Sequence, residues 1–412
     1  MTFYKQRKPH HFLAVSCLAF AIASTCTTSF TAQAQNNAVY DALSSGSVFA
    51  DFRLRYEGVS QDNILEDANA LTFRTRLGYT SGDLDGWSFT VEMEDNRIAL
   101  GVGDYTVGPS GFNPGIYSVI ADPEFTELDQ GFVQYKKDGF TAKIGRQVIA
   151  FDTHRFVGHV GWRQDRQTFD AASFIYAPNK DVKVQYSYLD QRNRIFGEDA
   201  DIDAKDHLLN ASYQTELGKL VGYAYLLETD IETSNALDTY GLSFNGSQDF
   251  DGIKLIYGIE YAKQSSKTDL VDFDADYLFT EFGATFSGVT AKVGYEVLGS
   301  DDGNYGFSTP LATLHKFNGW SDQFLSTPIL GLIDTSVTLT GSAFGGKWLA
   351  VYHDFQADDG NDVLDDYGTE INLQYVTKFA ENYEVAVKYA DYSSDGFNTD
   401  TEKLWVWVST KF

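Results

Sequence analysis

The stretch Phe49–Gly58 reads FADFRLRYEG, and apolar and charged side chains alternate strictly through its centre. Phe52, Leu54 and Tyr56 share one face if the stretch is extended, because successive side chains of a strand point to opposite sides. The other face is charged throughout, and it carries Asp51, Arg53, Arg55 and Glu57. A charged face opposite an apolar face predicts a strand that separates water from a nonpolar environment.

The same alternation continues along the chain, whereas helical periodicity is almost absent. LTFRTRLGYT (71–80) sets Arg74 and Arg76 against an apolar face, and NYEVAVKYA (382–390) repeats the pattern. The connections alternate in length, with short turns such as KKDG and APNK after even-numbered strands and longer loops such as 97–125 and 299–334 after odd-numbered ones. We predict eighteen strands, centred on residues 52, 75, 91, 131, 144, 172, 186, 211, 223, 242, 257, 281, 293, 339, 351, 373, 387 and 408.

This pattern predicts an all-β fold, a transmembrane antiparallel β-barrel of about eighteen strands with short periplasmic turns and long external loops. A soluble β-sandwich would also bury one face of each strand. The regular alternation of loop length weighs against it, and no repeat of propeller-blade length is present. Barrels of this size enclose an aqueous channel, so passive transport is the expected activity.

The first residues have the composition of an export signal. A basic start, the apolar run Phe12–Ala23 and the small-residue site Ala32–Ala34 predict a secretory signal peptide over residues 1–34. Residues 35–46 would follow as a periplasmic N-terminal segment, and 47–412 as the barrel. Both cysteines, Cys17 and Cys26, lie in the predicted leader, so a mature chain without disulfides is expected.

The last residues, KLWVWVSTKF, form the predicted closing strand. Leu404, Val406 and Val408 would face lipid, and the C-terminal Phe412 resembles the signal by which the barrel-assembly machinery recognises its substrates. Trp405 and Trp407 would then point inward, and we expect them to contact an inward-folded segment or residues 36–46. Both termini are expected in the periplasm of a Gram-negative cell.

Charge and composition exclude several functions. A net charge of −27 argues against nucleic acid as a partner, and no stretch is apolar for the 18 residues that a membrane helix needs. The acidic external loops predict a solvated outer face in contact with lipopolysaccharide, and whether they bind divalent cations is left open; they include 197–206, 271–276 and 357–366. None has the spacing of a calcium loop. Scattered histidines and the absence of a Ser-His-acid motif predict no enzyme activity, metal or cofactor.

Arginines are concentrated on the polar faces of the first two strands. Arg53, Arg55, Arg74 and Arg76 would lie side by side, with Glu92 and Glu94 on the next strand as partners. One interpretation is a salt-bridge ladder that stiffens the wall. The other is a basic track for anions, because arginine is always charged and binds carboxylates bidentately. The sequence leaves both open.

A second basic cluster follows in KIGRQVIAFDTHRFVGHVGWRQDRQTFD, and it contributes Arg146, Arg155, Arg163 and Arg166. Strict alternation puts Arg146 on the lipid face with Ile144, and a bulge at Gly145 would turn it inward. GRQ, HRFVG, GWRQDRQTFD and PLATLHKFNGWSDQFLSTPILGLID (310–334) resemble the alginate-export family of outer-membrane channels and their porin-like relatives. The resemblance implies an eighteen-stranded barrel whose arginine-lined pore passes an acidic polysaccharide or its fragments. The implied pore-facing cations are Arg53, Arg55, Arg74, Arg76, Arg146, Arg155, Arg163 and Arg166.

The longest loop, 299–334, is a candidate for folding into the lumen. His315, Lys316 and Trp320 are possible sugar contacts, and the alternative is a loop that simply packs on the barrel wall. The prediction from sequence is an outer-membrane porin for small hydrophilic solutes, with anionic sugars or acidic, alginate-like oligosaccharides preferred. The alternatives are an exopolysaccharide exporter, or a structural or adhesive barrel that acts through its external loops.

Overall fold

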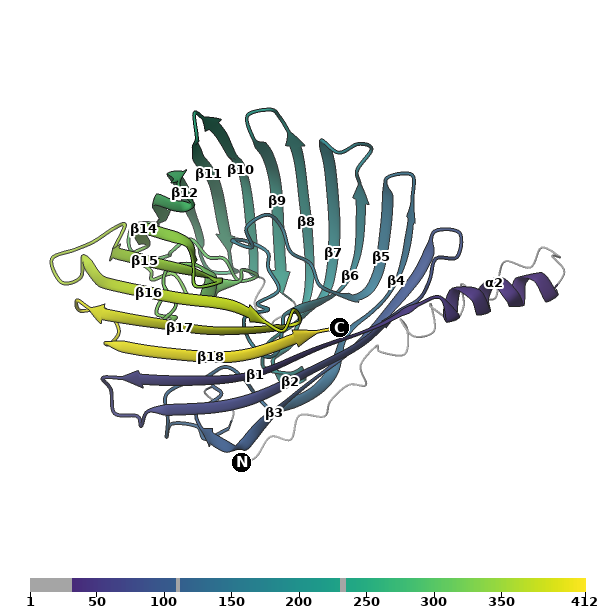
Figure 1. Cartoon of the computed structure of the whole chain (residues 1–412). Coiled ribbons are helices and arrows are strands. Elements are labelled where there is room, and N and C mark those ends of the chain that lie inside the picture. Colours follow the sequence, from purple (N-terminus) through teal and green to yellow (C-terminus); the bar gives the residue numbers. More distant parts are fainter. Residues whose placement is uncertain (1–31, 109–111, 230–234) are drawn as a thin grey trace.

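The computed structural model describes residues 32–108, 112–229 and 235–412. The predicted leader, 1–34, lies outside these residues except for its last three, which begin the helix α2 (Ala32–Ser44). The helix projects from the rim of a barrel (Figure 1). Within the described residues, no helix is long and apolar enough to cross a membrane.

Eighteen antiparallel strands form a single closed sheet, as predicted. Each strand pairs with its sequence neighbours, and β18 pairs with β1 from Asp51↔Lys411 to Gln61↔Thr401. The strands are β1 (Ser47–Gln61), β2 (Ala68–Thr80), β3 (Trp87–Asp104), β4 (Phe125–Lys137), β5 (Phe140–Gln147), β6 (Thr168–Tyr176), β7 (Val182–Asn193), β8 (Ile202–Gln214), β9 (Lys219–Thr229), β10 (Asn235–Phe250), β11 (Ile253–Lys267), β12 (Asp272–Phe286), β13 (Val289–Leu298), β14 (Leu332–Ala343), β15 (Gly346–Gln356), β16 (Asp366–Phe379), β17 (Tyr383–Ser394) and β18 (Thr401–Lys411). Short 3-10 turns, η2 (Glu198–Ala200) and η3 (Leu314–Lys316), lie in two of the longer loops.

The strands continue further on the long-loop side than the sequence predicts. The sequence predicts an external loop over residues 271–276, but only 268–271 lie between β11 and β12. The apolar alternation stops in KQSSK (263–267), while the backbone pairing with β12 continues. Beyond the lipid both faces of a strand meet polar surroundings, so the hydrophobic pattern ends before the hydrogen bonds do. Every predicted strand centre nevertheless lies inside a strand.

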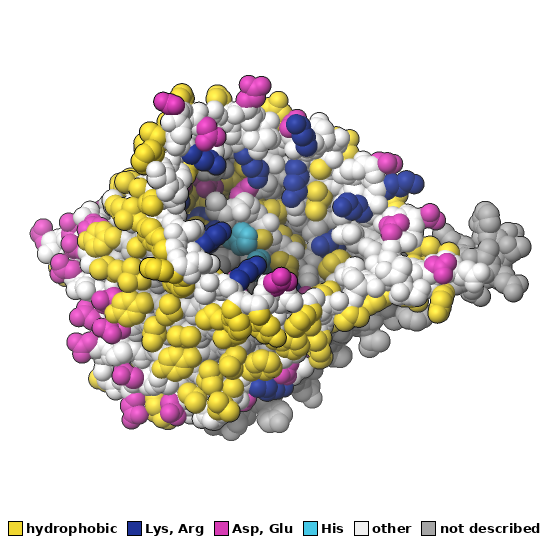
Figure 2. Space-filling model, viewed as in Figure 1, with side chains coloured by type: hydrophobic (Ala, Val, Ile, Leu, Met, Phe, Trp, Pro, Cys, Tyr) yellow, Lys and Arg dark blue, Asp and Glu magenta, His cyan; other side chains and the backbone are white. Residues whose placement is uncertain are grey.

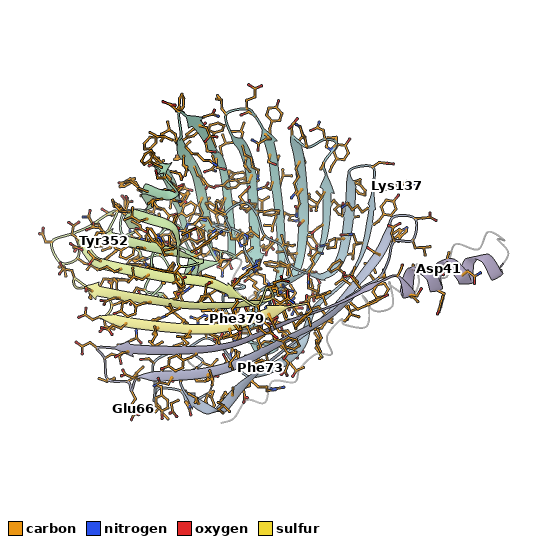
Figure 3. The ribbon with its side chains drawn as sticks, viewed as in Figure 1. Asp41, Glu66, Phe73, Lys137, Tyr352 and Phe379 are labelled. Atoms are coloured by element: carbon orange, nitrogen blue, oxygen red, sulfur yellow. The ribbon has the colours of Figure 1, made fainter. Side chains whose placement is uncertain are left out.

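The outer wall is apolar. Leu404, Val406 and Val408 of β18 are exposed on it, opposite Gly58, Tyr56 and Leu54 of β1, so the predicted lipid face of the closing strand is confirmed. Phe73 and Tyr352 mark the same wall on two sides of the barrel (Figure 3). In the space-filling view, hydrophobic side chains cover the outside, whereas Lys and Arg side chains surround a central hollow (Figure 2).

Three loops fill much of the interior, and we call them the inward loops: 105–124 (of which the structure describes 105–108 and 112–124), 148–167 and 299–331. Strand-like pairing of Val157 with Leu311 joins the second loop to the third. Phe156 packs against Tyr277 of the wall and Phe307 of the third loop, with ring centroids 5.2 and 5.9 Å apart. Loop and wall therefore share a hydrophobic core inside the barrel, which holds the polar groups described next in fixed positions.

Candidate functional site

The tip of the inward loop 148–167 rests on the arginines of β1. Arg53 donates hydrogen bonds to the Gln164 side chain at 2.9 Å and to the Trp162 carbonyl at 3.0 Å. Arg55 donates to the same carbonyl and pairs with Glu57 at 3.2 Å and with Asp122 of the loop 105–124. Arg55 is 1% exposed. Both side chains therefore fasten loops to the wall, and Arg55 is withdrawn from solvent.

The other predicted pore arginines of the wall are also paired. Arg74 binds Asp51 at 2.6 Å, and Arg76 lies 2.8 Å from Glu94. Of the two predicted partners on β3, Glu94 therefore pairs with an arginine of the wall, whereas Glu92 pairs with Arg166 of an inward loop. In Figure 2 the basic side chains line the hollow, but these arginines are buried beneath loop residues.

The loop arginines extend this network across the lumen. Arg163 binds Glu57 of β1 at 2.9 Å and Asp322 of the third inward loop at 3.0 Å. Burial alone would lower the pKa of Arg163, but the carboxylates of Glu57 and Asp322 raise it above its ordinary value. Burial likewise opposes the charge of Asp122, yet Arg55 and Arg163 hold its pKa below the usual range. Arg163 and Asp122 are thus held in their charged forms by the groups that surround them.

Two further arginines complete the network. Arg155 binds Glu296 of β13 at 2.7 Å and Asn318 at 3.1 Å. Arg166 binds Glu92 at 2.6 Å and also pairs with Asp129.

Arg146 lies apart from the network. It pairs with Asp170 of β6 at 2.8 Å and donates to the Leu128 carbonyl. The register of β5 with β4 and β6 runs through Gly145 without a shift, so the predicted bulge is wrong. Gly145 instead has a φ of +121°, and a Cβ there would lie 2.2 Å from the Gly131 carbonyl oxygen. Close approach of the neighbouring strand is the reason for glycine at this position.

A buried lysine of the barrel wall, on the strand next to β18, anchors the third inward loop, 299–331. Lys388 of β17 has its Nζ 3.7 Å from the Trp320 ring centroid and 4.1 Å from that of Trp162. The same Nζ lies 2.7 Å from His315 Nε2. His315 Nδ1 in turn lies 2.6 Å from Asp322, which also binds Lys403 of β18 at 2.8 Å. A cation in an aromatic cage and a chain of charged hydrogen bonds therefore hold the loop to β17 and β18.

The predicted sugar contacts lie within this anchor. His315 and Trp320 are buried, and Lys316 donates to the Thr153 carbonyl at 2.8 Å. Trp405 and Trp407 each meet Trp162 edge-on with centroids 5.5 Å apart. The prediction that both tryptophans contact an inward-folded segment is therefore confirmed. In this arrangement His315 and Trp320 pack the loop and do not face solute.

A ring of lysines, which the sequence analysis did not single out, faces the lumen near the short turns. We call these the ring lysines; each odd-numbered strand from β5 to β15 supplies one within its first four residues, and they are Lys143, Lys183, Lys219, Lys254, Lys292 and Lys347. By alternation Lys183 shares a face with buried Gln185, and Lys292 with buried Glu296. The signal in the sequence is the position of each lysine, on the polar face of its strand just after a short turn.

The ring lysines differ from the arginines in exposure. Lys219 is 43% exposed and binds Asp152 of an inward loop at 2.8 Å, and Lys292 is 28% exposed and binds Glu281 at 2.7 Å. Arg55 and Arg74, by contrast, are almost fully covered. A solute in the lumen would therefore meet lysines before arginines. Among the described residues, no group of three or more His, Asp, Glu or Cys side chains is arranged to hold a metal ion.

Solved structures with the same architecture include outer-membrane proteins of two bacteria. Pseudomonas aeruginosa OpdK with vanillate aligns with a TM-score of 0.71 and 13% identity over 90% of this chain and 99% of that one. Pseudomonas aeruginosa OccK9 (OpdG) gives 0.69 and 15% over 90% and 100%, and Acinetobacter baumannii OccAB4 gives 0.70 and 12% over 89% and 98%. At these identities the likeness shows the fold, a porin-like outer-membrane barrel.

A search of curated proteins finds no match to this sequence. A family model described as alginate export matches residues 41–297. That match spans more than half of the chain, and the chain belongs to the alginate export family.

Proposed function

We propose that the chain forms a passive outer-membrane channel for small hydrophilic anions, with carboxylated sugars preferred over neutral ones. The observation that carries this proposal is the ring of six lysines on the lumen wall of a chain whose net charge is −27. Cations are thus gathered on the lumen wall near the short turns.

The physical argument is electrostatic focusing. A cleft lined by one sign of charge with low-dielectric walls raises the local concentration of counter-ions. Salt screens exposed charges over about 8 Å at physiological ionic strength, but screening is weaker in a confined lumen. The arginines are neutralised by buried carboxylates, and Lys219 and Lys292 have carboxylate partners of their own. The attractive field therefore comes mainly from ring lysines that have no ion pair among the described residues, which include Lys183, Lys254 and Lys347.

The contents of the lumen favour small solutes over a polymer. The inward loops are tied to the wall by ion pairs such as Arg163–Asp322 and Arg155–Glu296, and an exporter would have to break many of them at once. The solved structure of OpdK with vanillate supports the passage of a small anion through this fold. Nothing in the described residues suggests catalysis, and the chain acts in this proposal as a channel.

The proposal also assigns each rim of the barrel to one side of the outer membrane. The short-turn rim, where β1 begins and β18 ends, would face the periplasm, and the long-loop rim with its acidic segments would face lipopolysaccharide. Residues 1–34 would be removed on export, residues 35–46 would stay in the periplasm, and Phe412 would guide the assembly machinery.

Liposome swelling tests the proposal. Liposomes that contain the purified chain should swell faster in glucuronate than in glucose, and control liposomes should not swell in either. Replacing Lys183, Lys219 and Lys292 with Gln should remove the preference. The matched control replaces Lys180, Lys263 and Lys267, exposed lysines outside the ring, with Gln. Equal rates for glucuronate and glucose in the wild-type protein would refute anion preference, and the absence of swelling would refute the channel.

A further inference from the structure

The inward loop 299–331 contains the sequence Ser-Thr-Pro twice, at 308–310 and 326–328. The structure places the two copies next to each other, because the Thr327 hydroxyl donates to the Phe307 carbonyl at 2.6 Å. The first copy is also fixed to the barrel wall: Gln264 of β11 accepts from the Ser308 amide at 2.7 Å and donates to its carbonyl at 2.8 Å. The two copies therefore form a rigid pair.

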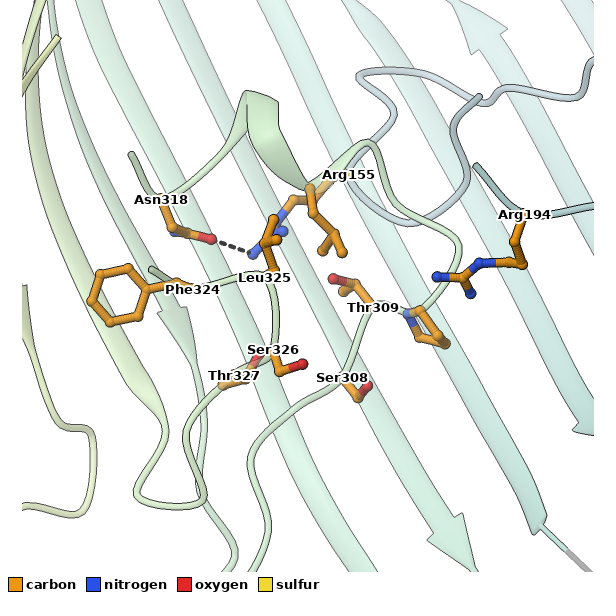
Figure 4. A pocket seen from close by; sticks show the side chains of 11 residues that line it. Arg155, Arg194, Ser308, Thr309, Asn318, Phe324, Leu325, Ser326 and Thr327 are labelled. Carbon is orange, nitrogen blue, oxygen red and sulfur yellow. Dashed lines mark hydrogen bonds between the residues drawn. The ribbon is translucent and has the colours of Figure 1, made fainter. Parts of the chain in front are cut away.

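A pocket of about 180 Å³ lies between them (Figure 4). Both copies line it through their Ser and Thr side chains. Arg155 enters from the loop 148–167, and Arg194, just after β7, points toward Thr309 from the other side. Three loops that are distant in sequence thus converge on one polar space.

Several donors in this pocket have no protein partner. Within the part of the chain that the structure describes, no hydrogen bond reaches the hydroxyls of Ser308, Thr309 or Ser326, and no hydrogen bond or ion pair reaches the Arg194 guanidinium. Arg155 differs, because its guanidinium already binds Glu296 and Asn318. The pocket therefore offers one guanidinium that no hydrogen bond or ion pair engages, and three free hydroxyls.

The charge around Arg194 favours an added anion. Burial and the neighbouring Arg192 lower the pKa of Arg194, and the Asp201 carboxylate offsets them only in part, so the cation is less well stabilised than one in water. A single guanidinium with no hydrogen-bond partner suits a monoanion, and a planar carboxylate matches its fork of donors. Pockets for drug-sized ligands measure roughly 300–1,000 Å³, so this smaller space suits one sugar-sized unit and excludes an oligomer.

We propose that this pocket binds a small hydroxylated monocarboxylate, such as a sugar acid, with its carboxylate on Arg194 and its hydroxyls on Ser308, Thr309 and Ser326. The proposal rests on the proposed function, because it treats the ligand as a solute in transit and names its class. It adds a resting position for that solute, made by the third inward loop and separate from the ring lysines.

Binding of D-glucuronate to the detergent-solubilised full chain tests the site, by saturation-transfer NMR with glucose, acetate and inorganic phosphate as comparison ligands. Glucuronate should bind most tightly. Arg194→Met should weaken its binding about tenfold, the scale of a lost charge-assisted hydrogen bond. Arg97→Met is the matched control, because Arg97 is 50% exposed and lies on β3 outside the pocket, and it should leave binding unchanged.

The double variant Ser308→Ala, Ser326→Ala should weaken the binding of glucuronate and leave the binding of acetate unchanged. Unchanged glucuronate binding in Arg194→Met would overturn the site, and equal binding of phosphate or glucose would overturn its assignment to monocarboxylates. Conductance in potassium chloride, measured on the same preparations, confirms folding. A conducting wild-type channel that does not bind glucuronate refutes the pocket alone, whereas binding without conductance refutes the channel alone.

Discussion

Asp322→Asn should release the third inward loop from the barrel wall. Asp322 is 6% exposed and binds His315 at 2.6 Å, Lys403 at 2.8 Å and Arg163 at 3.0 Å. Burial opposes its charge, but these partners hold its pKa well below the ordinary value. A lowered pKa means that the stabilisation is complete at pH 7 and is lost only as the pH falls below 3.8.

The size of the effect follows from what the amide leaves behind. Removing one partner of a buried ion pair costs about 3–5 kcal/mol, because the remaining charges stay buried. Arg163 keeps Glu57 as a partner in the variant. The lost stabilisation therefore comes mainly from the contacts of Asp322 with Lys403 and His315. At about 1.4 kcal/mol for each factor of ten, the loop should open about 10²- to 10³-fold more often.

Hydrogen exchange of the Trp320 and Ser321 amides measures this opening. Both amides donate to Glu370 of β16, so they exchange only when the loop leaves the wall. They should exchange about 10²- to 10³-fold faster in Asp322→Asn. Asp362→Asn, in an exposed external loop, is the control and should change nothing. Wild-type exchange in Asp322→Asn would refute the claim that ion pairs anchor the loop.

Three further perturbations test other parts of the interior. Trp162→Ala removes a ring stacked on His315 at 4.5 Å, and a loss of about 3–5 kcal/mol is expected as faster exchange over 148–167; unchanged exchange there would contradict it. Burial, with His154 and Arg166 nearby, lowers the pKa of His159 to about 4. The NMR signals of its ring protons should therefore stay constant down to about pH 5. A titration midpoint near 6.5 would show that the loop is open to water. Among the described residues, no donor reaches either carboxylate oxygen of Asp165, and burial with Glu127 and Glu94 nearby raises its pKa. Asp165→Asn should therefore change the urea midpoint of unfolding little. A large loss of stability would show that the charge of Asp165 is needed.

The barrel can be predicted from the sequence because the side-chain pattern of each strand reflects the surroundings of its two faces. Lipid on one side and water or protein on the other impose alternation of period two, and that signal is local. Leu54, Val406 and their neighbours therefore indicate the outer wall without knowledge of any contact. The strand ends were misjudged where lipid no longer imposes the pattern, as in 263–267.

The interior depends on contacts that no local pattern reveals. Arg163 meets Glu57 and Asp322, which lie 106 and 159 residues away along the chain. The arginines were identified as inward cations, but their burial beneath the inward loops could not be read from alternation. The ring lysines were readable in principle, since Lys183, Lys219 and Lys254 each follow a short turn on the polar face.

The reversal potential across a planar bilayer with a potassium chloride gradient tests the central claim most directly. If the ring lysines set the field in the lumen, the wild-type channel prefers chloride. Replacement of Lys183, Lys219 and Lys292 with Gln then moves the potential toward zero, while the Lys180, Lys263 and Lys267 control keeps the wild-type value. A wild-type channel that prefers potassium, or a chloride preference that survives the ring substitutions, would contradict the account.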